Sequence, residues 1–300
     1  MSGRDLTAAG ILDPDLRASY ERCRRLTARH GRTYYLATRL LPPGKRPYVH
    51  ALYGFARVAD EIVDGPARAD PAAPRRLRDW GDGLAADVRR GFSNDPVRAA
   101  VVDTVLRWDI PVEHFAAFMD SMAMDLTVSE YPTYEDLLGY VHGSAAVIGL
   151  QMVPILEPTD DRAYPAARDL GIAFQLANFV RDVGEDLDRG RVYLPLEDLA
   201  RFGLDRDDLE RRVVDDRVRA LLAFEIARVR RLEDAARPGI DLLAPSSRPC
   251  IDAARILYCG IADEVEAIDY QVFDHRATVP MRRRLSVAGR AWLRSRSTSG

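Results

Sequence analysis

The sequence QLANFVRDVGED, residues 175–186, is the segment from which both the fold and the site can be inferred. Its apolar residues recur at the spacing of an α-helix. Its polar residues are separated by three, four and four positions: Gln175, Asn178, Asp182 and Asp186. Residues three or four apart share a helix face, so this spacing predicts a helix over about 166–187 with one polar stripe on an otherwise apolar surface.

A second pair of acids lies earlier in the chain with the same spacing. Asp60 and Asp64 follow the mostly apolar run 48–59, which predicts a helix over about 46–64. Two carboxylates at positions i and i+4 repel each other weakly on a surface and more strongly when they are buried. A divalent cation removes this repulsion, and Mg²⁺ typically takes one or two carboxylates together with water and phosphate oxygens.

Each acid pair is accompanied by an arginine. Arg57 lies three residues before Asp60, on the same helix face, and Arg181 is adjacent to Asp182. The planar guanidinium group matches the oxygens of a phosphate. One such acid pair alone is typical of a solvated helix face. Two pairs, each in an apolar helix and each beside an arginine, predict a site for Mg²⁺ and a diphosphate.

The composition is that of a globular protein and excludes several classes. The 300 residues are 47% hydrophobic and 30% charged, with a net charge of −3, so no basic surface indicates binding to nucleic acid. The 3 cysteines lack the spacing of a zinc site or a disulfide framework. We find no signal peptide and no apolar run of about 20 residues, so we expect no membrane span and a cytoplasmic location.

The pattern along the chain predicts an all-α protein, because no segment shows the alternation of a strand. We expect a flexible leader over 1–12, a single domain over 13–285 and a basic tail over 286–300. Helices are expected at about 13–29, 34–41, 46–64, 75–90, 96–107, 111–128, 133–150, 166–187, 196–201, 205–211, 215–236 and 250–270. The small residues of 133–150, among them Gly143 and Gly149, predict close approach of another helix.

At this point the sequence resembles the squalene/phytoene synthase family over nearly its whole length, and bacterial phytoene synthases most of all. The motifs that carry the resemblance, in order, are HGRTYYLAT (30–38) before LLP (40–42), ALYGFAR (51–57) before DEIVD (60–64), QLANFVRDVGED (175–186) before RGRVYLP (189–195), and DEVEA (263–267) before Asp269 and Tyr270.

The resemblance implies an isoprenoid synthase fold, a single-domain helical bundle around a central cavity with two facing Asp-rich helices. It also implies Mg²⁺-dependent transfer between prenyl diphosphates. The implied metal ligands, direct or through water, are Asp60, Asp64, Asn178, Asp182 and Asp186. The implied substrate-binding residues are Arg32, Thr33, Tyr34, Tyr53, Arg57, Gln175 and Arg181.

Such a reaction requires an apolar wall beside the charged site. Ionisation of an allylic diphosphate leaves a carbocation, which must be kept from water and can be stabilised by an aromatic face. The metal ions and arginines stabilise the departing diphosphate. Candidate wall residues are Phe55, Phe115, Phe118, Met122, Leu126, Val147, Leu150 and Phe174. The Met/Phe-rich run over 111–128 is equally typical of an ordinary core.

Two residues depart from the family pattern. His142 stands where many members carry a tyrosine, and Cys259 stands where we expect a basic residue. A neutral imidazole at position 142 could act as a base in catalysis, and the alternative is that it only donates a hydrogen bond to the diphosphate or a neighbour. Both departures leave the predicted metal site intact and leave the substrate pair open.

Three functions remain at this stage. The first is phytoene synthase, which joins two geranylgeranyl diphosphates head to head and needs no nicotinamide. The second, motivated by His142 and Cys259, is a related enzyme that transfers a dimethylallyl group to an aromatic acceptor. The third is a catalytically inactive helical partner protein, against which the two complete acid pairs argue.

The C-terminal segment is strongly basic. Its charged and aromatic residues are Arg282, Arg283, Arg284, Arg290, Trp292, Arg294 and Arg296. A basic segment with an aromatic anchor could make a peripheral contact with anionic lipid, and the alternative is a solvated tail. The oligomeric state has no signature in the sequence.

Overall fold

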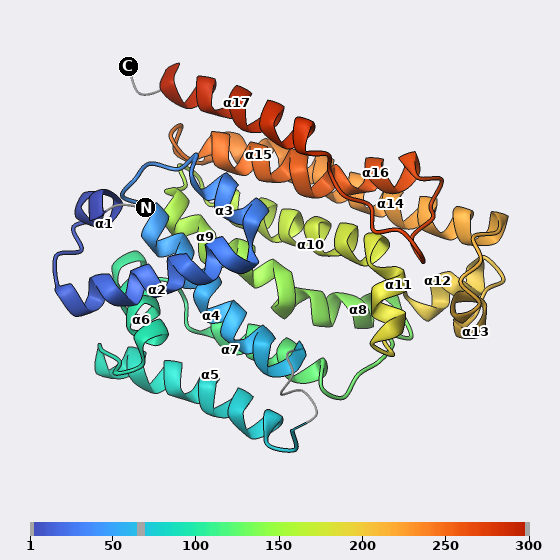
Figure 1. Ribbon diagram of the computed structural model, residues 1–300, viewed down its shortest axis with the longest axis horizontal. Helices are drawn as coiled ribbons and strands as arrows, with labels where there is room; N and C mark the ends of the chain where they lie inside the picture. Colours follow the sequence, from blue (N-terminus) through green and yellow to red (C-terminus); the bar gives the residue numbers. More distant parts are fainter. Residues whose placement is uncertain (1–2, 65–69, 298–300) are drawn as a thin grey trace.

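The computed structural model describes residues 3–64 and 70–297, and in the last helix it leaves out the side chains of 288 and 292–297. It is an all-α bundle, as predicted (Figure 1). The helices are α1 (Gly3–Ala8), α2 (Pro14–His30), α3 (Arg32–Thr38), α4 (Arg46–Asp64), α5 (Ala73–Arg90), α6 (Pro96–Trp108), α7 (Glu113–Met124), α8 (Tyr134–Val141), a π-helical segment (His142–Ala146), α9 (Val147–Leu156), α10 (Ala163–Arg181), α11 (Val183–Asp188), α12 (Leu196–Arg201), α13 (Arg206–Glu210), α14 (Asp216–Ala236), a 3₁₀ turn (Arg237–Leu242), α15 (Arg248–Cys259), α16 (Ile261–Ala267) and α17 (Met281–Ser297). Within the described ranges the only β pairing is two isolated bridges.

The two acid helices, α4 and α10, each lie at the centre of one apolar cluster. Helix α4 packs against α2, α5, α6 and α7, whereas α10 packs against α9, α14, α15 and α16. Leu52 and Phe55 belong to the first cluster, and Leu176 and Phe179 belong to the second. Ile251 packs against both clusters and joins them. The acid-bearing ends of α4 and α10 therefore meet across the middle of the molecule (Figure 1).

Both ends of the chain differ from the prediction. The expected flexible leader is wrong for residues 3–11, because they include α1 and bury Leu6 and Ile11. Tyr48 anchors this segment by donating a hydrogen bond to the carbonyl oxygen of Ala9 at 2.9 Å. The expected boundary at 285 falls inside α17, which packs against α15. The side chains of Trp292, Arg294 and Arg296 lie outside the described residues.

Two predicted helices are interrupted where the site forms. The segment 166–187 is divided at Asp182, whose φ of −99° and ψ of 14° end α10 and begin α11. The segment 133–150 contains the π-helical turn His142–Ala146 and continues to Leu156. The period of apolar residues does not reveal an inserted residue within one turn, so sequence spacing alone predicted continuous helices.

The small residues of the α8–α9 segment allow the close approach that their sequence predicts. A Cβ atom on Gly143 would lie 2.1 Å from the carbonyl oxygen of Ala117 in α7. A Cβ atom on Gly149 would lie 2.4 Å from the carbonyl oxygen of Ala167 in α10. The segment is therefore held between α7 and α10 by backbone contact that only glycine permits.

The same segment bears on the expectation that the chain has no membrane-length run. Among the described helices, Tyr134–Leu156 is long and apolar enough to span a bilayer, so that expectation is wrong by length and composition. Half of its most apolar window is buried inside the protein, between α7 and α10. This packing supplies a sufficient reason for its apolar composition.

Candidate active site

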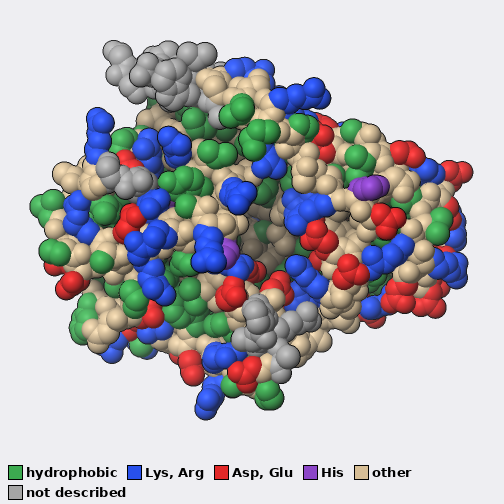
Figure 2. Space-filling view, in the orientation of Figure 1, with side chains coloured by type: hydrophobic (Ala, Val, Ile, Leu, Met, Phe, Trp, Pro, Cys, Tyr) green, Lys and Arg blue, Asp and Glu red, His purple; other side chains and the backbone are tan. Residues whose placement is uncertain are grey.

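A polar cavity of about 320 Å³ separates the acid-bearing ends of α4 and α10, and we call it the acid cavity. Figure 2 shows a hollow near the middle of this face, with acidic and basic side chains around it. The cavity brings together nine of the predicted site residues: Tyr53, Arg57, Asp60, Asp64, Gln175, Asn178, Arg181, Asp182 and Asp186. The sequence pattern of the two helices therefore identified the acids, the amides and two arginines of the site, whereas Tyr53 was implied by the family resemblance.

On α4, arginines partly neutralise the first acid pair. Arg57 forms ion pairs with Asp60 and with Glu61. Burial raises the pKa of Asp60 above its ordinary value, although the charge of Arg57 opposes this. Asp64 accepts a hydrogen bond of 3.0 Å from Nη1 of Arg191, which lies in the loop after α11. The two acids of this pair thus have different cationic partners.

The second acid pair spans the break between α10 and α11. Nε of Arg181 lies 2.6 Å from Oδ1 of Asp182, and Nε of Arg276 lies 3.2 Å from the same oxygen. Burial, together with the charge of Asp182, raises the pKa of Asp186 to about 7. The nearest cation to Asp186 is Arg189, at 3.9 Å. Asp186 is therefore the least compensated carboxylate of the four.

These residues fit a magnesium site. The raised pKa values of Asp60 and Asp186 show carboxylates crowded in a partly desolvated space, and a divalent cation would keep both ionised. Carboxylate and amide oxygens are the ligands that Mg²⁺ prefers. No group of three acidic, His or Cys side chains converges within the described part of the chain. Because Mg²⁺ completes its shell with water and phosphate, one or two carboxylates per ion are sufficient.

Four buried residues with polar side chains that the sequence analysis did not select also line the acid cavity: Asp125, Tyr140, Arg191 and Tyr193. Arg191 and Tyr193 lie in the motif RGRVYLP, so the family resemblance could have identified them. Asp125 has no neighbouring acid at helical spacing and follows the end of α7. Only the long-range packing of α7 against the π-helical segment reveals it.

The catalytic role expected for His142 is wrong. Its side chain is exposed, and it is not among the residues that line the acid cavity. Tyr140 and Ser144, four positions apart, face the cavity instead, and a residue midway between them points elsewhere. Cys259 is buried but also lines no part of the cavity. Neither departure from the family pattern therefore reaches the site.

The early substrate-binding segment is only partly at the site. Arg32 is exposed, and neither it nor Thr33 lines the acid cavity. Tyr34 lies with its ring centroid 5.4 Å from that of Tyr53, which does line the cavity. Its hydroxyl group lies 3.4 Å from the sulfur of Met152. Tyr34 thus belongs to the adjoining apolar space.

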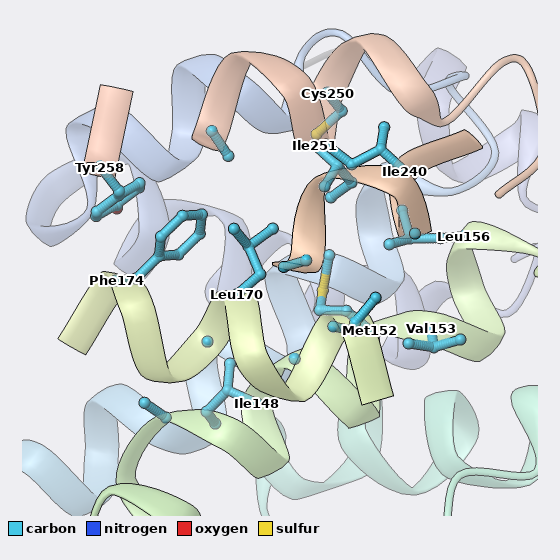
Figure 3. A pocket seen from close by; sticks show the side chains of 18 of the residues that line it. Ile148, Met152, Val153, Leu156, Leu170, Phe174, Ile240, Cys250, Ile251 and Tyr258 are labelled. Carbon is cyan, nitrogen blue, oxygen red and sulfur yellow. The ribbon is translucent and has the colours of Figure 1, made fainter. Parts of the chain in front are cut away.

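That space is an apolar pocket of about 260 Å³ between α9, α10 and α15 (Figure 3). It follows α10 from Ala163 to Gln175, which is about 18 Å at the rise of an α-helix. Figure 3 shows Phe174 and Tyr258 at one end and Val153 at the other. The rings of Phe174 and Tyr258 stack, with their centroids 4.9 Å apart.

Ser144 and Gln175 line both the acid cavity and the apolar pocket, so the two spaces meet there. We call this junction the neck. The hydroxyl oxygen of Ser144 is buried and has no hydrogen-bond partner among the described residues. The π-helical segment supplies Ser144, and α10 supplies Gln175.

The expected apolar wall is distributed over several places. Phe174 lines the apolar pocket, and Phe118 and Met122 line the acid cavity. The other candidates line neither space: Phe55 and Val147 are in the core, Phe115 and Leu126 line a groove between α5 and α7, and Leu150 is partly buried elsewhere. The Met/Phe-rich helix α7 therefore contributes to core and cavity together.

Comparison with known proteins agrees with this geometry. The model of the squalene/phytoene synthase family matches residues 27–283. The chain belongs to the squalene/phytoene synthase family. This family member is 39% identical over 289 residues to 15-cis-phytoene synthase of Synechocystis sp., covering 92% of this chain and 85% of that protein. It is 38% identical to chloroplastic phytoene synthase 2 of Solanum lycopersicum, covering 93% and 92%.

Solved structures of the squalene/phytoene synthase family share the fold. A dehydrosqualene synthase in complex with a ligand matches with a TM-score of 0.85 at 25% identity, covering 95% of this chain and 98% of that chain. Squalene synthase HpnC from Alicyclobacillus acidocaldarius matches with a TM-score of 0.80 at 29% identity, covering 88% and 98%. The predicted isoprenoid synthase fold is confirmed, and the chain is an enzyme of the prenyltransferase type.

Proposed function

We propose that this chain is a Mg²⁺-dependent phytoene synthase that joins two geranylgeranyl diphosphates head to head in carotenoid biosynthesis. The observation that carries the proposal is the continuity of the acid cavity with the apolar pocket at Ser144 and Gln175. One space suits a diphosphate and the other suits a long hydrocarbon chain. The relatives named phytoene synthase support the same substrate.

The carboxylates of the two acid pairs would hold the metal. Asp60 and Asp64 act from α4, while Asp182 and Asp186 act from the α10–α11 break, and Asn178 adds an amide oxygen. When bound, Mg²⁺ supplies positive charge that stabilises the departing diphosphate. The chain's own contribution is to hold these carboxylates at fixed positions on rigid helices, where the charge of the metal would favour their ionised form.

Arginines supply the second part of the diphosphate site. Arg57 and Arg181 lie beside the two acid pairs, and Arg189 and Arg191 enter from the loop after α11. Each of them can turn from a carboxylate to a phosphate oxygen when metal ions occupy the acids. Tyr53 and Gln175 complete the wall on the side of the neck.

The apolar pocket would exclude water from the cation. Most of its lining is hydrocarbon, and Phe174 and Tyr258 present aromatic rings. The side chains with polar groups away from the neck are Tyr34, Thr38, Cys250 and Tyr258. Burial raises the pKa of Tyr258, so its phenol stays neutral. A neutral aromatic ring stabilises a nearby cation, and a protonated phenol is a much weaker nucleophile toward that cation than a phenolate.

The structure offers no support for an aromatic acceptor. His142 and Cys259 motivated that alternative, and both lie outside the acid cavity and the apolar pocket. The pocket is also long along α10 rather than short and wide.

We also propose a peripheral contact of α17 with anionic lipid. Met281 and Leu285 are 61% and 64% exposed beside the exposed Arg282. Arg283, by contrast, is engaged with Asp263 and Glu264. The test is flotation with anionic vesicles, in which Leu285→Asp should reduce the bound fraction. Equal flotation of wild type and variant would exclude the contact.

The function itself is tested by a product assay with Mg²⁺ and geranylgeranyl diphosphate as the sole substrate. We expect a C40 hydrocarbon with the mass and retention of phytoene, and none when EDTA removes the metal. A parallel incubation contains dimethylallyl diphosphate and an aromatic acceptor. Product in that incubation, with no hydrocarbon in the first, would contradict the proposal.

A further inference from the structure

One carboxylate in the acid cavity belongs to neither acid pair. Asp125 follows the end of α7, lines the cavity and is only 5% exposed. Its two oxygens accept hydrogen bonds from different tyrosines. The Tyr193 hydroxyl donates to Oδ1 at 2.8 Å, and the Tyr140 hydroxyl donates to Oδ2 at 3.0 Å. Both tyrosines also line the cavity.

The main chain of Asp125 makes a separate contact. Nη2 of Arg191 donates to its carbonyl oxygen at 2.8 Å, while Nη1 of the same arginine donates to Asp64 at 3.0 Å. Asp125 therefore connects the first acid pair with the two tyrosines. The carboxylate serves the tyrosines, and the carbonyl serves the arginine.

The direction of the two phenol hydrogen bonds follows from charge. Burial raises the pKa of Asp125 to about 6, so its carboxylate is ionised at neutral pH and can only accept. Burial and the charge of Asp125 raise the pKa values of Tyr140 and Tyr193, so both phenols remain protonated and donate. A hydrogen bond to a carboxylate makes the phenol oxygen and ring more electron-rich.

The rings are held as firmly as their hydroxyl groups. Tyr193 stacks on Phe179 with centroids 4.3 Å apart and planes 6° apart. Tyr140 lies 5.5 Å from Tyr193 between ring centroids. Turning either hydroxyl hydrogen into the cavity breaks its hydrogen bond to Asp125, and moving the Tyr193 ring also breaks its stack on Phe179.

We propose that Asp125 is a positioning residue that holds Tyr140 and Tyr193 with their hydroxyl hydrogens turned away from the reacting carbons and their electron-rich rings beside the allylic cation. The inference rests on the proposed function, because it requires a cation in the acid cavity. In this arrangement the phenols stabilise positive charge and offer it no proton. Asp125 acts through the tyrosines and does not bind the metal.

The variant Asp125→Asn distinguishes positioning of the tyrosines from metal binding and from the main-chain contact with Arg191. The variant keeps the size of the side chain and the carbonyl oxygen that Arg191 uses. It has one acceptor oxygen, and its amide group is a donor. One tyrosine therefore loses its acceptor and must turn its hydroxyl group elsewhere.

The experiment measures diphosphate release, which reports ionisation regardless of the later product. We expect Asp125→Asn to lower kcat about 100-fold. The KM for geranylgeranyl diphosphate and the Mg²⁺ concentration at half-maximal rate should stay within about threefold of wild type. The control is Asp120→Asn in α7, five positions before Asp125; Asp120 is exposed, lies outside the acid cavity and should keep wild-type rates when changed.

A double-mutant cycle with Tyr140→Phe tests whether Asp125 acts through the tyrosine. If it does, the double variant is no slower than the slower single variant, because the second change removes nothing further. Multiplicative losses would overturn the inference. So would an unchanged kcat in Asp125→Asn, or a tenfold or greater increase in its Mg²⁺ requirement, which would identify a metal ligand.

Two further measurements keep the result interpretable. If Asp125→Asn unfolds, Tyr193→Phe leaves the carboxylate in place and should lower kcat with unchanged KM; an unchanged kcat would overturn the inference. If the wild type releases diphosphate from geranylgeranyl diphosphate without forming a C40 hydrocarbon, the proposed function fails. The cycle then still decides the role of Asp125 from diphosphate release.

Discussion

The acid cavity and the apolar pocket are neighbouring spaces along α10, and they differ in charge. The cavity is lined by carboxylates and arginines, whereas the pocket is lined by uncharged side chains. Along α10 the pocket is lined by Ala163, Leu170 and Phe174, and beyond the shared Gln175 the helix lines the cavity with Asn178. In the cavity, carboxylates are paired with arginines, while burial raises the pKa values of Asp60 and Asp186. In the pocket, burial keeps every titratable group neutral. The proposed reaction needs a charged site for the diphosphate and an apolar site for the hydrocarbon, separated by no more than the length of one prenyl chain.

The largest expected effect is the loss of a carboxylate from the acid cavity. Asp182→Ala removes a carboxylate from the break between α10 and α11, and we expect kcat/KM to fall by about 10³-fold. The control is Asp188→Ala, which removes an exposed carboxylate from the end of α11 and should have little effect. Turnover is measured with geranylgeranyl diphosphate and Mg²⁺. Wild-type turnover in Asp182→Ala would remove the metal assignment from this acid pair.

The exclusion of water from the apolar pocket can be tested through the thiol of Cys250, which lines it. Burial raises the pKa of Cys250 in the apolar pocket from an ordinary value near 9 to about 12, and that of Cys23 in the core to about 12. The thiolate fraction at pH 8 then falls by about 10³-fold, and reaction with a disulfide reagent slows accordingly. We expect the 3 buried thiols to react rapidly only in denaturant. A thiol in the folded protein that reacts rapidly at pH 8 would show that water reaches these sites.

Binding of metal and diphosphate in the acid cavity should stabilise the folded chain. With inorganic diphosphate and Mg²⁺ at about 100 times the dissociation constant, linkage gives about 2.7 kcal/mol of added stability. For a chain of this size that is a Tm increase of about 4 °C. The increase should disappear with EDTA and in Asp182→Ala. An equal increase with diphosphate alone would mean that the arginines suffice and the carboxylates hold no metal.

A change at the far end of the apolar pocket should have a smaller and more selective effect. Ala163→Phe fills the end opposite the neck, so a C20 chain no longer fits as well as a C15 chain. We expect the ratio of kcat/KM for geranylgeranyl over farnesyl diphosphate to fall about tenfold. Ala200→Phe, at an exposed site on α12, is the control for adding a ring to a helix. Unchanged selectivity in Ala163→Phe would mean that the chain does not lie along α10.

Most of the acid cavity could be predicted because its residues repeat within single helices. Asp60 and Asp64, like Asn178 and Asp182, are four positions apart, and helical geometry places such residues on one face whatever the remainder of the chain does. Arg57 is three positions before Asp60, and Arg181 is next to Asp182, so both arginines also follow from short sequence distances. Local periodicity alone shows which residues share a helix face, so these site residues can be predicted without the tertiary structure.

His142 and Asp125 show where this reasoning ends. Tyr140 faces the cavity and His142 does not, because the face that α8 turns inward depends on its packing between α7 and α10. Asp125 meets Tyr193, 68 positions later in the chain, and no local pattern joins them. The break at Asp182 and the π-helical turn are also backbone adjustments to packing, and apolar spacing cannot register them.

The sequence by itself determined the helical architecture, the two acid pairs and their arginines, since each depends on residues within one or two turns. Only the tertiary structure decided that the acid cavity opens into a pocket along α10, that Ser144 and Gln175 form the neck, and that Asp125 supports two tyrosines. The physical reason is that a cavity is bounded by side chains from helices far apart in sequence. Their relative rotation is set by close packing of the whole bundle.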